Sequence, residues 1–415
     1  MGAGCVWYHR VMYMRTEAAL RAIGLVVIAL VCVCARVGVG QEKGEGRVRV
    51  FVLAGQSNME GFGHVRTLAR LGDDARGAEL LAKFKDERGG WKVRDDVFVY
   101  FRSGERVGNL TVGFGAHEPF VGPELAFGTL MGDMYEEPVL LIKTAWGGKD
   151  LHLDFRPPSA GKLPYPIDPK ALEERGGEGA VGANYRAMVK DVKDCLGKMG
   201  EYFPALKGRE YEIVGFVWFQ GWNEMFPAKG CEFETVVADY SKLYATMVGD
   251  LERDLGVARL PSVVGEMGVN GEKATGRIVE LRKQQAKIAD EPTLAGKVRF
   301  VRTAPLWDPK LDEMQERERV VRRAAREAVR ERVEREIAPK LEGKNEKERG
   351  EMMNRAMDAA IEGTEEYKAW NAEWEKIAGH WECHYWGSGP TYCRIGAGLA
   401  EAMKELLAQP KGEAR

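Results

Sequence analysis

A short apolar segment that runs directly into a tight polar turn constrains this chain more than any other feature. Residues 48–54 are rich in β-branched and aromatic side chains, which is typical of a strand buried in a parallel sheet. Gly55 permits a sharp turn, and Gln56, Ser57 and Asn58 follow at the carboxyl end of the strand, where open α/β sheets bind ligands. Ser57 is therefore a candidate nucleophile, although many serines in this position only cap the next helix.

After residue 45, strand-like and helix-like segments alternate. This alternation predicts an α/β fold in which a parallel sheet carries helices on both faces. Right-handed crossovers place the carboxyl ends of parallel strands at one edge, so the turns at Ser57, 146–148 and 220–223 can converge there. The apolar runs are 48–54, 97–101, 138–144, 212–219, 262–267 and 298–303, and amphipathic patterns occupy about 123–135, 184–200, 236–255 and 273–289.

Residues 309–371 differ from the rest of the chain in composition. Arg, Glu and Lys dominate the segment and apolar residues are sparse, which predicts one or two long charged helices. The simplest interpretation is a solvated helical insertion, and the alternative is a lid or docking element over a nearby site. We thus expect a leader at 1–40, an α/β domain whose first part is 45–308, the insertion at 309–371, and the remainder of the domain at 372–408.

The amino terminus has the pattern of an export signal. Arg15 and Arg21 precede an apolar run at 23–35, which has about the length of a signal-peptide core and is short for a membrane span. Small residues at 33–35 or 38–40 offer cleavage sites. We expect an exported protein (periplasmic, cell-surface or secreted) with no stable membrane insertion after cleavage; an uncleaved anchor is the alternative.

Charge and cysteine content limit the partners and the chemistry. The net charge of −2 and the pI near 6.4 give no reason to expect a nucleic-acid partner, which usually requires a basic face. Removal of the leader leaves Cys195, Cys231, Cys383 and Cys393, which allow three pairings in an oxidising compartment. The sequence does not choose among these pairings, and it leaves the oligomeric state unknown.

Five sequence blocks together resemble the sialate O-acetylesterase family of the SGNH hydrolases. The resemblance implies a flavodoxin-like SGNH hydrolase fold, an acetylated carbohydrate as substrate, either a sialate or a polysaccharide, and hydrolysis without a cofactor. The blocks are Gly-Gln-Ser-Asn-Met at 55–59, Phe-Val-Gly-Pro-Glu-Leu-Ala-Phe-Gly at 120–128, Lys-Thr-Ala-Trp-Gly-Gly-Lys at 143–149, Val-Trp-Phe-Gln-Gly-Trp-Asn-Glu at 217–224 and His-Tyr-Trp-Gly-Ser at 384–388.

A serine nucleophile needs a base that takes its proton. His384 is the strongest candidate, because it precedes a Gly-Ser turn and a final amphipathic segment at 391–407. The base histidine of the resembled family occupies the same place. Most SGNH enzymes carry an aspartate three residues before this histidine, and here that position is Trp381.

Several groups are candidates for the missing acid. Glu382 is the nearest carboxylate to His384 in the sequence, and we expect it to be the third catalytic residue. Asp308 and Glu266 follow apolar runs and are alternatives. A backbone carbonyl that orients the imidazole would leave a dyad of Ser57 and His384.

Acyl transfer also requires hydrogen-bond donors for the developing oxyanion. The candidates are the amides of Ser57 and Gly122 and the side-chain amide of Asn223 or Gln220. Asn223 follows Gly221 at the SGNH spacing, whereas sialate-type members more often carry Gln-Gly-Glu-Ser-Asp there. Both side chains are alternatively helix caps or satisfied core amides.

We assign substrate contacts to Gln56, Trp146, Gly147 and Trp222. Indole rings suit stacking on a sugar face but serve equally well in a core. The same alternatives hold for Trp218 and Trp386 beside the blocks. Substrate carboxylates would suit Arg102, Lys143 or Arg156, for which surface charge is the simpler interpretation.

The spacing of His380, Cys383, His384 and Cys393 matches no standard zinc site, so we predict no metal. The sequence thus predicts an exported serine esterase that removes O-acetyl groups from carbohydrates through an acyl-Ser57 intermediate. The alternative is a non-catalytic carbohydrate-binding protein on the same fold.

Overall fold

The computed structural model describes residues 46–164 and 166–409, all of which belong to one compact unit. The predicted leader and its cleavage sites lie outside the described residues. Within the described ranges, no helix is both long and apolar enough to cross a membrane. Cys195, Cys231, Cys383 and Cys393 are all free thiols.

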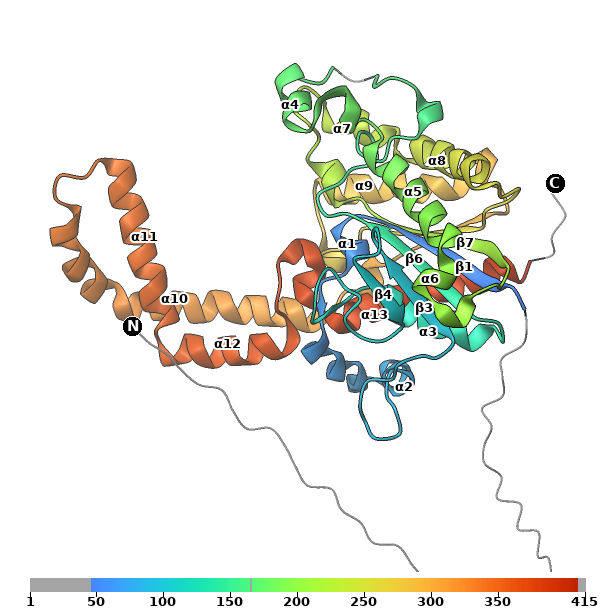
Figure 1. Ribbon diagram of the computed structural model, residues 1–415. Helices are drawn as coiled ribbons and strands as arrows, with labels where there is room; N and C mark the ends of the chain where they lie inside the picture. Colours follow the sequence, from blue (N-terminus) through green and yellow to red (C-terminus); the bar gives the residue numbers. More distant parts are fainter. Residues whose placement is uncertain (1–45, 165, 410–415) are drawn as a thin grey trace, which may run out of the picture. The chain divides into compact units, whose positions relative to one another are not determined.

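A seven-stranded sheet forms the centre of the unit, in the order β4-β3-β6-β1-β7-β8-β9 (Figure 1). All neighbouring strands are parallel except the edge pair β3 and β4. The α/β class predicted from the alternation of segments is therefore confirmed, and the antiparallel edge strand was not predicted. The strands are β1 (Val48–Gly55), β3 (Val97–Phe101), β4 (Arg106–Asn109), β6 (Val139–Ala145), β7 (Tyr211–Phe219), β8 (Ser262–Gly265) and β9 (Val298–Val301). A separate ribbon pairs β2 (Gly63–His64) with β5 (Phe120–Val121).

The register of the central strands brings three turns to one edge. Gly55 at the end of β1 pairs with Ala145 at the end of β6 and with Phe219 at the end of β7. A side chain at position 55 would meet the Phe219 carbonyl oxygen at 2.2 Å, and its φ of 151° also favours glycine. The turns at 56–58, 146–148 and 220–223 consequently leave the sheet side by side, as predicted.

Helices cover both faces of the sheet. On one face, α3 (Glu124–Met134) and α13 (Gly389–Leu407) pack against each other and against the strands. On the opposite face lie α5 (Ala183–Gly197), α8 (Tyr240–Leu255) and α9 (Arg277–Ala286) (Figure 1). The shorter helices are α1 (Ser57–Glu60), α2 (Ala75–Lys83), α4 (Pro169–Glu174), α6 (Met199–Tyr202) and α7 (Phe233–Ala238), and the 3-10 helices used below are η1 (Val65–Asp73), η5 (Trp222–Met225) and η11 (Glu382–Gly387).

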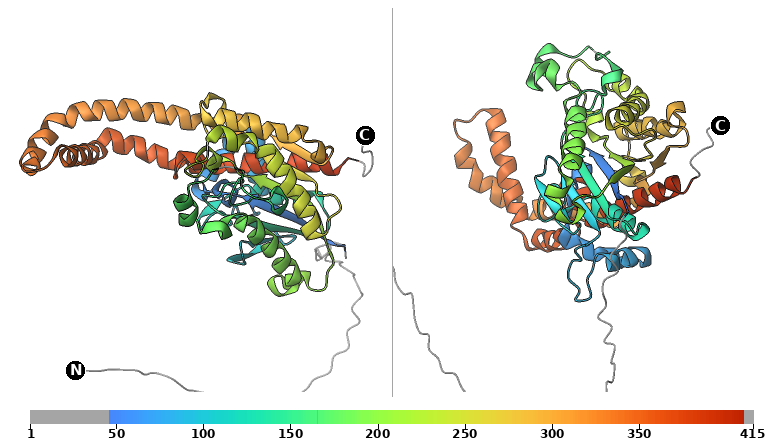
Figure 2. Two further views of the ribbon diagram at one scale, coloured as in Figure 1. Left: turned by 90° about the horizontal axis from the view of Figure 1, so that it is seen from above. Right: turned by 45° about the vertical axis from the view of Figure 1, so that its right-hand side comes forward.

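The charged insertion forms three helices where one or two were predicted. They are α10 (Pro309–Ile337), α11 (Glu346–Glu362) and α12 (Glu365–Ile377), and the last of them runs past the predicted boundary at residue 371. Figure 2 shows α10 and α12 running side by side. The Trp370 indole donates to the Met314 carbonyl at 2.9 Å, so α12 is fixed to the base of α10.

Candidate active site

The turn that carries Ser57, here termed the nucleophile turn (residues 55–60), is a direct continuation of the central strand β1. Ser57 is the first residue of α1 and is only 7% exposed. The side chains of Gln56 and Asn58 on either side are fully buried and hydrogen-bonded. The backbone at this point is therefore fixed by the strand before Ser57 and by side-chain contacts on both sides of it.

The Asn58 side chain connects the nucleophile turn to the segment that carries His384. Its Nδ2 donates to the Cys383 carbonyl at 3.1 Å, and its Oδ1 accepts from the Tyr392 hydroxyl at 2.8 Å. The residue after Ser57 is thus bonded to the residue before His384, although more than 300 residues of sequence separate them. The structure brings these two predicted residues into one neighbourhood.

His384 lies in the base loop, which we define as residues 379–388 and which includes η11. The imidazole is 8% exposed and stacks on Phe62, with ring centroids 4.1 Å apart and planes at 6°. Tyr385 and Trp386 both have a φ of 52°, a left-handed conformation that non-glycine residues adopt only when their surroundings enforce it. This backbone conformation sets the direction of the loop directly after His384.

The protonation state of His384 suits a base. Burial, and secondarily the neighbouring His380, lower its pKa from 6.5 to about 4. Burial together with His117 also lowers the pKa of His380. Near pH 7 both imidazoles are neutral, so His384 has a lone pair available to take a proton.

The carboxylates predicted as the third catalytic residue are bonded elsewhere. Glu382 accepts a hydrogen bond from the Asn270 side chain at 2.5 Å. Asp308 caps α10 and forms an ion pair with Arg70, and Glu266 accepts the amides of residues 303 and 304. The hydrogen-bond partner of His384 is instead His380, whose Nδ1 lies 2.8 Å from the His384 Nδ1. Trp381, in the usual aspartate position, is 71% exposed.

Asn223 has the geometry of an oxyanion donor. The Gln56 side chain fixes the orientation of Asn223. Gln56 Nε2 donates to Asn223 Oδ1 at 3.0 Å, and Gln56 Oε1 accepts from the Asn223 backbone N–H at 3.3 Å. Within the described part of the chain, the Asn223 Nδ2 donates to no group, so both of its protons are available. Gln56, predicted to contact substrate, here positions Asn223.

Two of the other predicted donors, Gln220 and Gly122, are already engaged. The Gln220 Nε2 donates to the Lys149 carbonyl and to Glu224, both at 3.1 Å. The Gly122 amide donates to Glu124 at 2.8 Å, and the second oxygen of Glu124 pairs with the buried Lys143 ammonium at 2.7 Å. These contacts make Gln220 and Gly122 part of the supporting framework.

Gly147 lies directly beside Ser57. A Cβ atom built on Gly147 would lie 3.7 Å from the Ser57 Cβ and 3.1 Å from a carboxylate oxygen of Glu60. A larger residue would narrow the space next to Ser57. The sequence analysis places Gly147 among the substrate contacts. Its position just after β6, beside Ser57, also makes its backbone N–H a candidate donor to the oxyanion.

The predicted tryptophans divide into two groups. Trp218 is fully buried in the core, where its indole donates to the Tyr240 hydroxyl at 3.0 Å, and Trp386 packs against Trp374 of the insertion at 5.3 Å. Trp146, Trp222 and Trp386 are all partly exposed, and Trp146 and Trp222 are the two that lie on turns at the sheet edge. The second pair is therefore accessible to a ligand.

The three cationic residues considered for a substrate carboxylate all have internal partners. Lys143 is completely buried with Glu124, and Arg102 pairs with Glu60 and Glu105. Arg156 donates to the carbonyls of residues 160–162. The charges of these three residues stabilise the folded segments around the site through these internal contacts.

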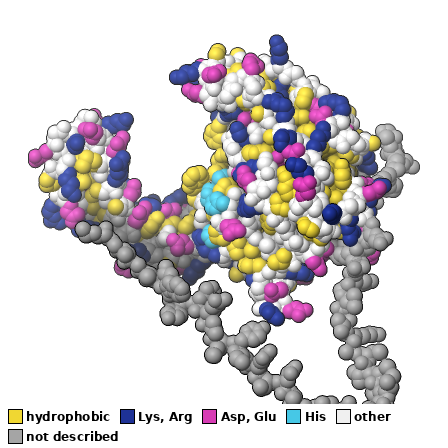
Figure 3. Space-filling view, viewed as in Figure 1, with side chains coloured by type: hydrophobic (Ala, Val, Ile, Leu, Met, Phe, Trp, Pro, Cys, Tyr) yellow, Lys and Arg dark blue, Asp and Glu magenta, His cyan; other side chains and the backbone are white. Residues whose placement is uncertain are grey.

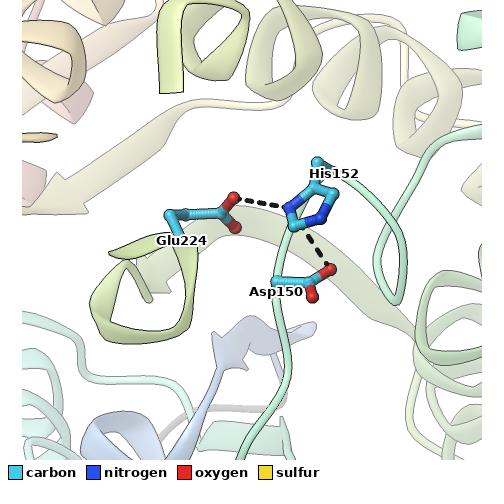
Figure 4. A group of neighbouring side chains, drawn as sticks. All are labelled: Asp150, His152 and Glu224. Atoms are coloured by element: carbon cyan, nitrogen blue, oxygen red, sulfur yellow. Dashed lines mark hydrogen bonds and ion pairs between the residues drawn. The ribbon is translucent and has the colours of Figure 1, made fainter. Parts of the chain in front are cut away.

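One group in the described ranges gathers enough ligand atoms for a metal ion, namely Asp150, His152 and Glu224 (Figure 4). His152 Nδ1 lies 2.9 Å from Glu224, and Arg175 pairs with Asp150 at 2.6 Å. Burial lowers the pKa of His152, but the two carboxylates outweigh it and raise that pKa above its ordinary value. Arg175 already pairs with Asp150, and Glu224 accepts the Leu151 amide as well as contacting His152, so we assign the group to the support of η5.

Comparison with known proteins identifies the family of the chain. The model of the family described as "Carbohydrate esterase, sialic acid-specific acetylesterase" matches residues 47–306. A search of curated protein sequences finds no match.

Three solved structures are similar to the chain. A protein from Arabidopsis thaliana shares 19% identity over 62% of this chain and 86% of its own, with a TM-score of 0.37. A carbohydrate acetylesterase from Xanthomonas citri shares 15% identity over 61% of this chain and 49% of its own, with a TM-score of 0.35. NanS shares 14% identity over 62% of this chain and 77% of its own, with a TM-score of 0.37. Because the family model covers more than half of the 415 residues, this protein belongs to the sialic acid-specific acetylesterase family of carbohydrate esterases.

Proposed function

We propose that this carbohydrate esterase removes O-acetyl groups through an acyl intermediate on Ser57, with His384 as the base. The observation that carries the proposal is the hydrogen bond from Asn58 to the Cys383 carbonyl, because it holds the serine and the histidine on adjacent segments. The lowered pKa of His384 supports the assignment, since the imidazole is neutral when the reaction begins.

The reaction has two halves. In the first, the Ser57 Oγ attacks the acetyl carbonyl carbon while His384 Nε2 takes the hydroxyl proton. The imidazolium then gives that proton to the departing sugar oxygen, which leaves as an alcohol. In the second half, His384 takes a proton from water, the oxygen attacks the acetyl group, acetate leaves and Ser57 regains its proton.

Three groups are suited to stabilise the tetrahedral intermediates. Asn223 Nδ2 donates to no group among residues 46–164 and 166–409, and Gln56 orients the side chain through Oδ1. The amides of Ser57 and Gly147 complete the proposed set, because Gly147 lies beside the serine. Gly122 and Gln220 act in this proposal as supports, since their donors are already used.

The proposed substrate is an acetylated carbohydrate. The partly exposed Trp146 and Trp222 lie on the two turns that flank Ser57, where they suit stacking on a sugar ring. Glu382 has no role in the proposal, because its carboxylate is held by Asn270.

Acetate release from a panel of acetylated sialates and acetylated polysaccharides tests the proposal. We expect the wild type to release acetate, and Ser57→Ala to lose this activity with an unchanged melting temperature. Ser159→Ala serves as the matched control, because it removes an exposed serine hydroxyl away from the nucleophile turn. An inert wild type that still binds glycans would favour the non-catalytic binding protein, for which the absence of an aspartate at Trp381 is the specific argument.

We also propose that the protein is exported. The support is the basic and apolar pattern of residues 15–35. Amino-terminal sequencing and protease protection test this proposal: a start between residues 34 and 42 agrees with export and cleavage, and an intact leader on protein that an external protease cannot reach contradicts export.

A further inference from the structure

We propose that His380 is the residue that positions His384, in the place where related hydrolases use a carboxylate. This inference rests on the proposed function. It gives a Ser57–His384–His380 arrangement in which the third member is a neutral imidazole.

The contact between the two rings determines their tautomers. The Nδ1 atoms lie 2.8 Å apart, so one must carry the proton and the other must accept it. If His380 were the donor, the proton of neutral His384 would sit on its Nε2, and that nitrogen could not take the Ser57 proton. A functional base therefore requires His384 Nδ1–H as the donor and His380 Nδ1 as the acceptor, with the His384 Nε2 lone pair left for Ser57.

His380 is held firmly enough to act as an orienting group. Its amide donates to the Trp386 carbonyl at 3.1 Å, which closes the base loop behind the two imidazoles. The Phe62 ring contacts both histidines, at 4.4 Å from His380 and 4.1 Å from His384. A Cβ on Gly387 would lie 3.1 Å from the His380 Cβ, so this glycine leaves the space that His380 occupies.

The other titratable groups near the pair have different partners. The Nδ1 of His117 contacts the Glu118 carbonyl at 3.0 Å, and the Nδ1 of His64 accepts the Arg66 amide at 3.3 Å. Both rings pack against Phe120. Glu382 is bonded to Asn270, and burial raises the pKa of the Cys383 thiol, so it stays neutral. Figure 3 shows histidine side chains gathered in a patch on this face.

A neutral partner changes the chemistry in a defined way. When His384 Nε2 takes the Ser57 proton, the imidazolium donates from Nδ1 to His380, and this hydrogen bond becomes charge-assisted. The bond therefore strengthens as the tetrahedral intermediate forms. It stabilises the imidazolium less than a carboxylate would, in agreement with the low pKa of His384.

The test compares three variants. His380→Phe keeps an aromatic ring against Phe62 but removes the acceptor, and His380→Gln restores an acceptor oxygen. His117→Phe is the matched control, because it changes a histidine of the same cluster that does not contact His384. The readouts are kcat and KM for acetate release, together with the nitrogen-15 NMR shifts of the His384 ring at pH 7.

We expect His380→Phe to lower kcat at least about tenfold with little change in KM, because orientation of the base acts on the chemical step. His380→Gln should recover part of this loss, and His117→Phe should behave as wild type. In the wild-type spectrum, His384 should carry its proton on Nδ1, and His380→Phe should abolish that preference.

Wild-type kcat in a folded His380→Phe variant would overturn the proposal. The NMR measurement separates this inference from the proposed function, since it requires no turnover. If the wild type releases no acetate, the esterase proposal fails, and the tautomer still decides the role of His380: a proton on Nδ1 of His384 supports it and a proton on Nε2 overturns it.

Discussion

The nucleophile turn and the base loop are held in place in different ways. The nucleophile turn extends the central strand of the sheet, and buried amide side chains fix it from both sides. The base loop has two non-glycine residues with positive φ, and aromatic rings and the helical insertion hold it. Arg66, for example, ties the end of α12 to η1 through the carbonyls of Glu375 and Ala378, at 2.7 and 2.8 Å.

This difference indicates that the sequence of the base loop can vary more readily than the sequence of the nucleophile turn. Changes in the nucleophile turn would disturb a strand that pairs on both sides, whereas the base loop is supported by side chains from distant segments. The departure from the usual SGNH pattern, Trp381 in place of aspartate, accordingly lies in the base loop. The predictions below test the two halves separately.

The largest effect should come from His384→Ala. Loss of the base in a serine hydrolase typically lowers kcat by about 10⁴-fold or more, because Ser57 can no longer be deprotonated. Stopped or continuous assays of acetate release measure this loss, with His117→Ala as the control. A loss of less than about tenfold would remove His384 from the mechanism.

The nucleophile turn should depend strongly on Lys143. Its ammonium donates to Glu124 and to the carbonyls of Glu60 and Phe114, and both charged side chains are fully buried. In Lys143→Met the Glu124 carboxylate has lost its buried partner, so the free energy of unfolding should fall by about 3–5 kcal/mol. Urea unfolding measures the change.

A double variant sharpens this prediction. Adding Glu124→Gln to Lys143→Met removes the uncompensated charge and should recover part of the lost stability. A Lys143→Met variant as stable as wild type would show that the ion pair does not support the nucleophile turn.

Asn223→Ala should separate catalysis from stability. Removal of one oxyanion donor typically lowers kcat by about 10²–10³-fold, and the half-exposed Asn223 contributes little to the core. Substitution of Gln220 should instead lower the melting temperature, because Glu224 and Tyr240 would lose a buried partner. Equal kcat for wild type and Asn223→Ala would contradict the assignment.

Trp374→Ala tests whether the insertion supports the base loop. The variant removes ring contacts with Trp386 at 5.3 Å and Trp370 at 5.6 Å. We expect faster amide exchange in residues 379–388, unchanged exchange in residues 55–60, and a loss of only a few-fold in kcat. Trp91→Ala is the control, because Trp91 is a partly exposed indole in the segment between α2 and β3, where it contacts Lys85. Exchange in residues 379–388 of Trp374→Ala that equals the wild-type exchange would mean that the insertion does not support this loop.

The smallest effect concerns pH. Because the pKa of His384 is lowered to about 4, the neutral base persists on acidification, and kcat/KM should stay nearly flat from pH 8 to about 5. Activity should fall as the pH drops through about 4. A midpoint near the ordinary value of 6.5 would show that the histidine is not desolvated in the working enzyme.

The sheet could be predicted because its strands are short apolar runs with clear boundaries. All six predicted runs are strands, whereas β4 was missed because Gly108 and Asn109 give this edge segment no apolar pattern. The insertion was predicted as helical, but the break between α10 and α11 was not. The capping box at Asn345 and Glu348 is the local signal for the start of α11.

Positions at the ends of strands were also accessible from the sequence, as Ser57 and Asn223 show. The partners of side chains were not. The use of Gln56 to hold Asn223, and of Glu124 to occupy the Gly122 amide, depends on contacts that appear only when the chain is folded. The contact between His380 and His384 is of the same kind, because the sequence pattern of the resembled family places a carboxylate and not an imidazole beside the base histidine.

The most direct test of the account is identification of the acyl intermediate. Wild-type protein mixed with p-nitrophenyl acetate and quenched rapidly in acid should carry one acetyl group on the peptide that contains Ser57, as measured by mass spectrometry. The Ser57→Ala variant should carry none and should release no acetate above background. An acetyl group on another residue, or turnover by Ser57→Ala at the wild-type rate, would contradict the central claim.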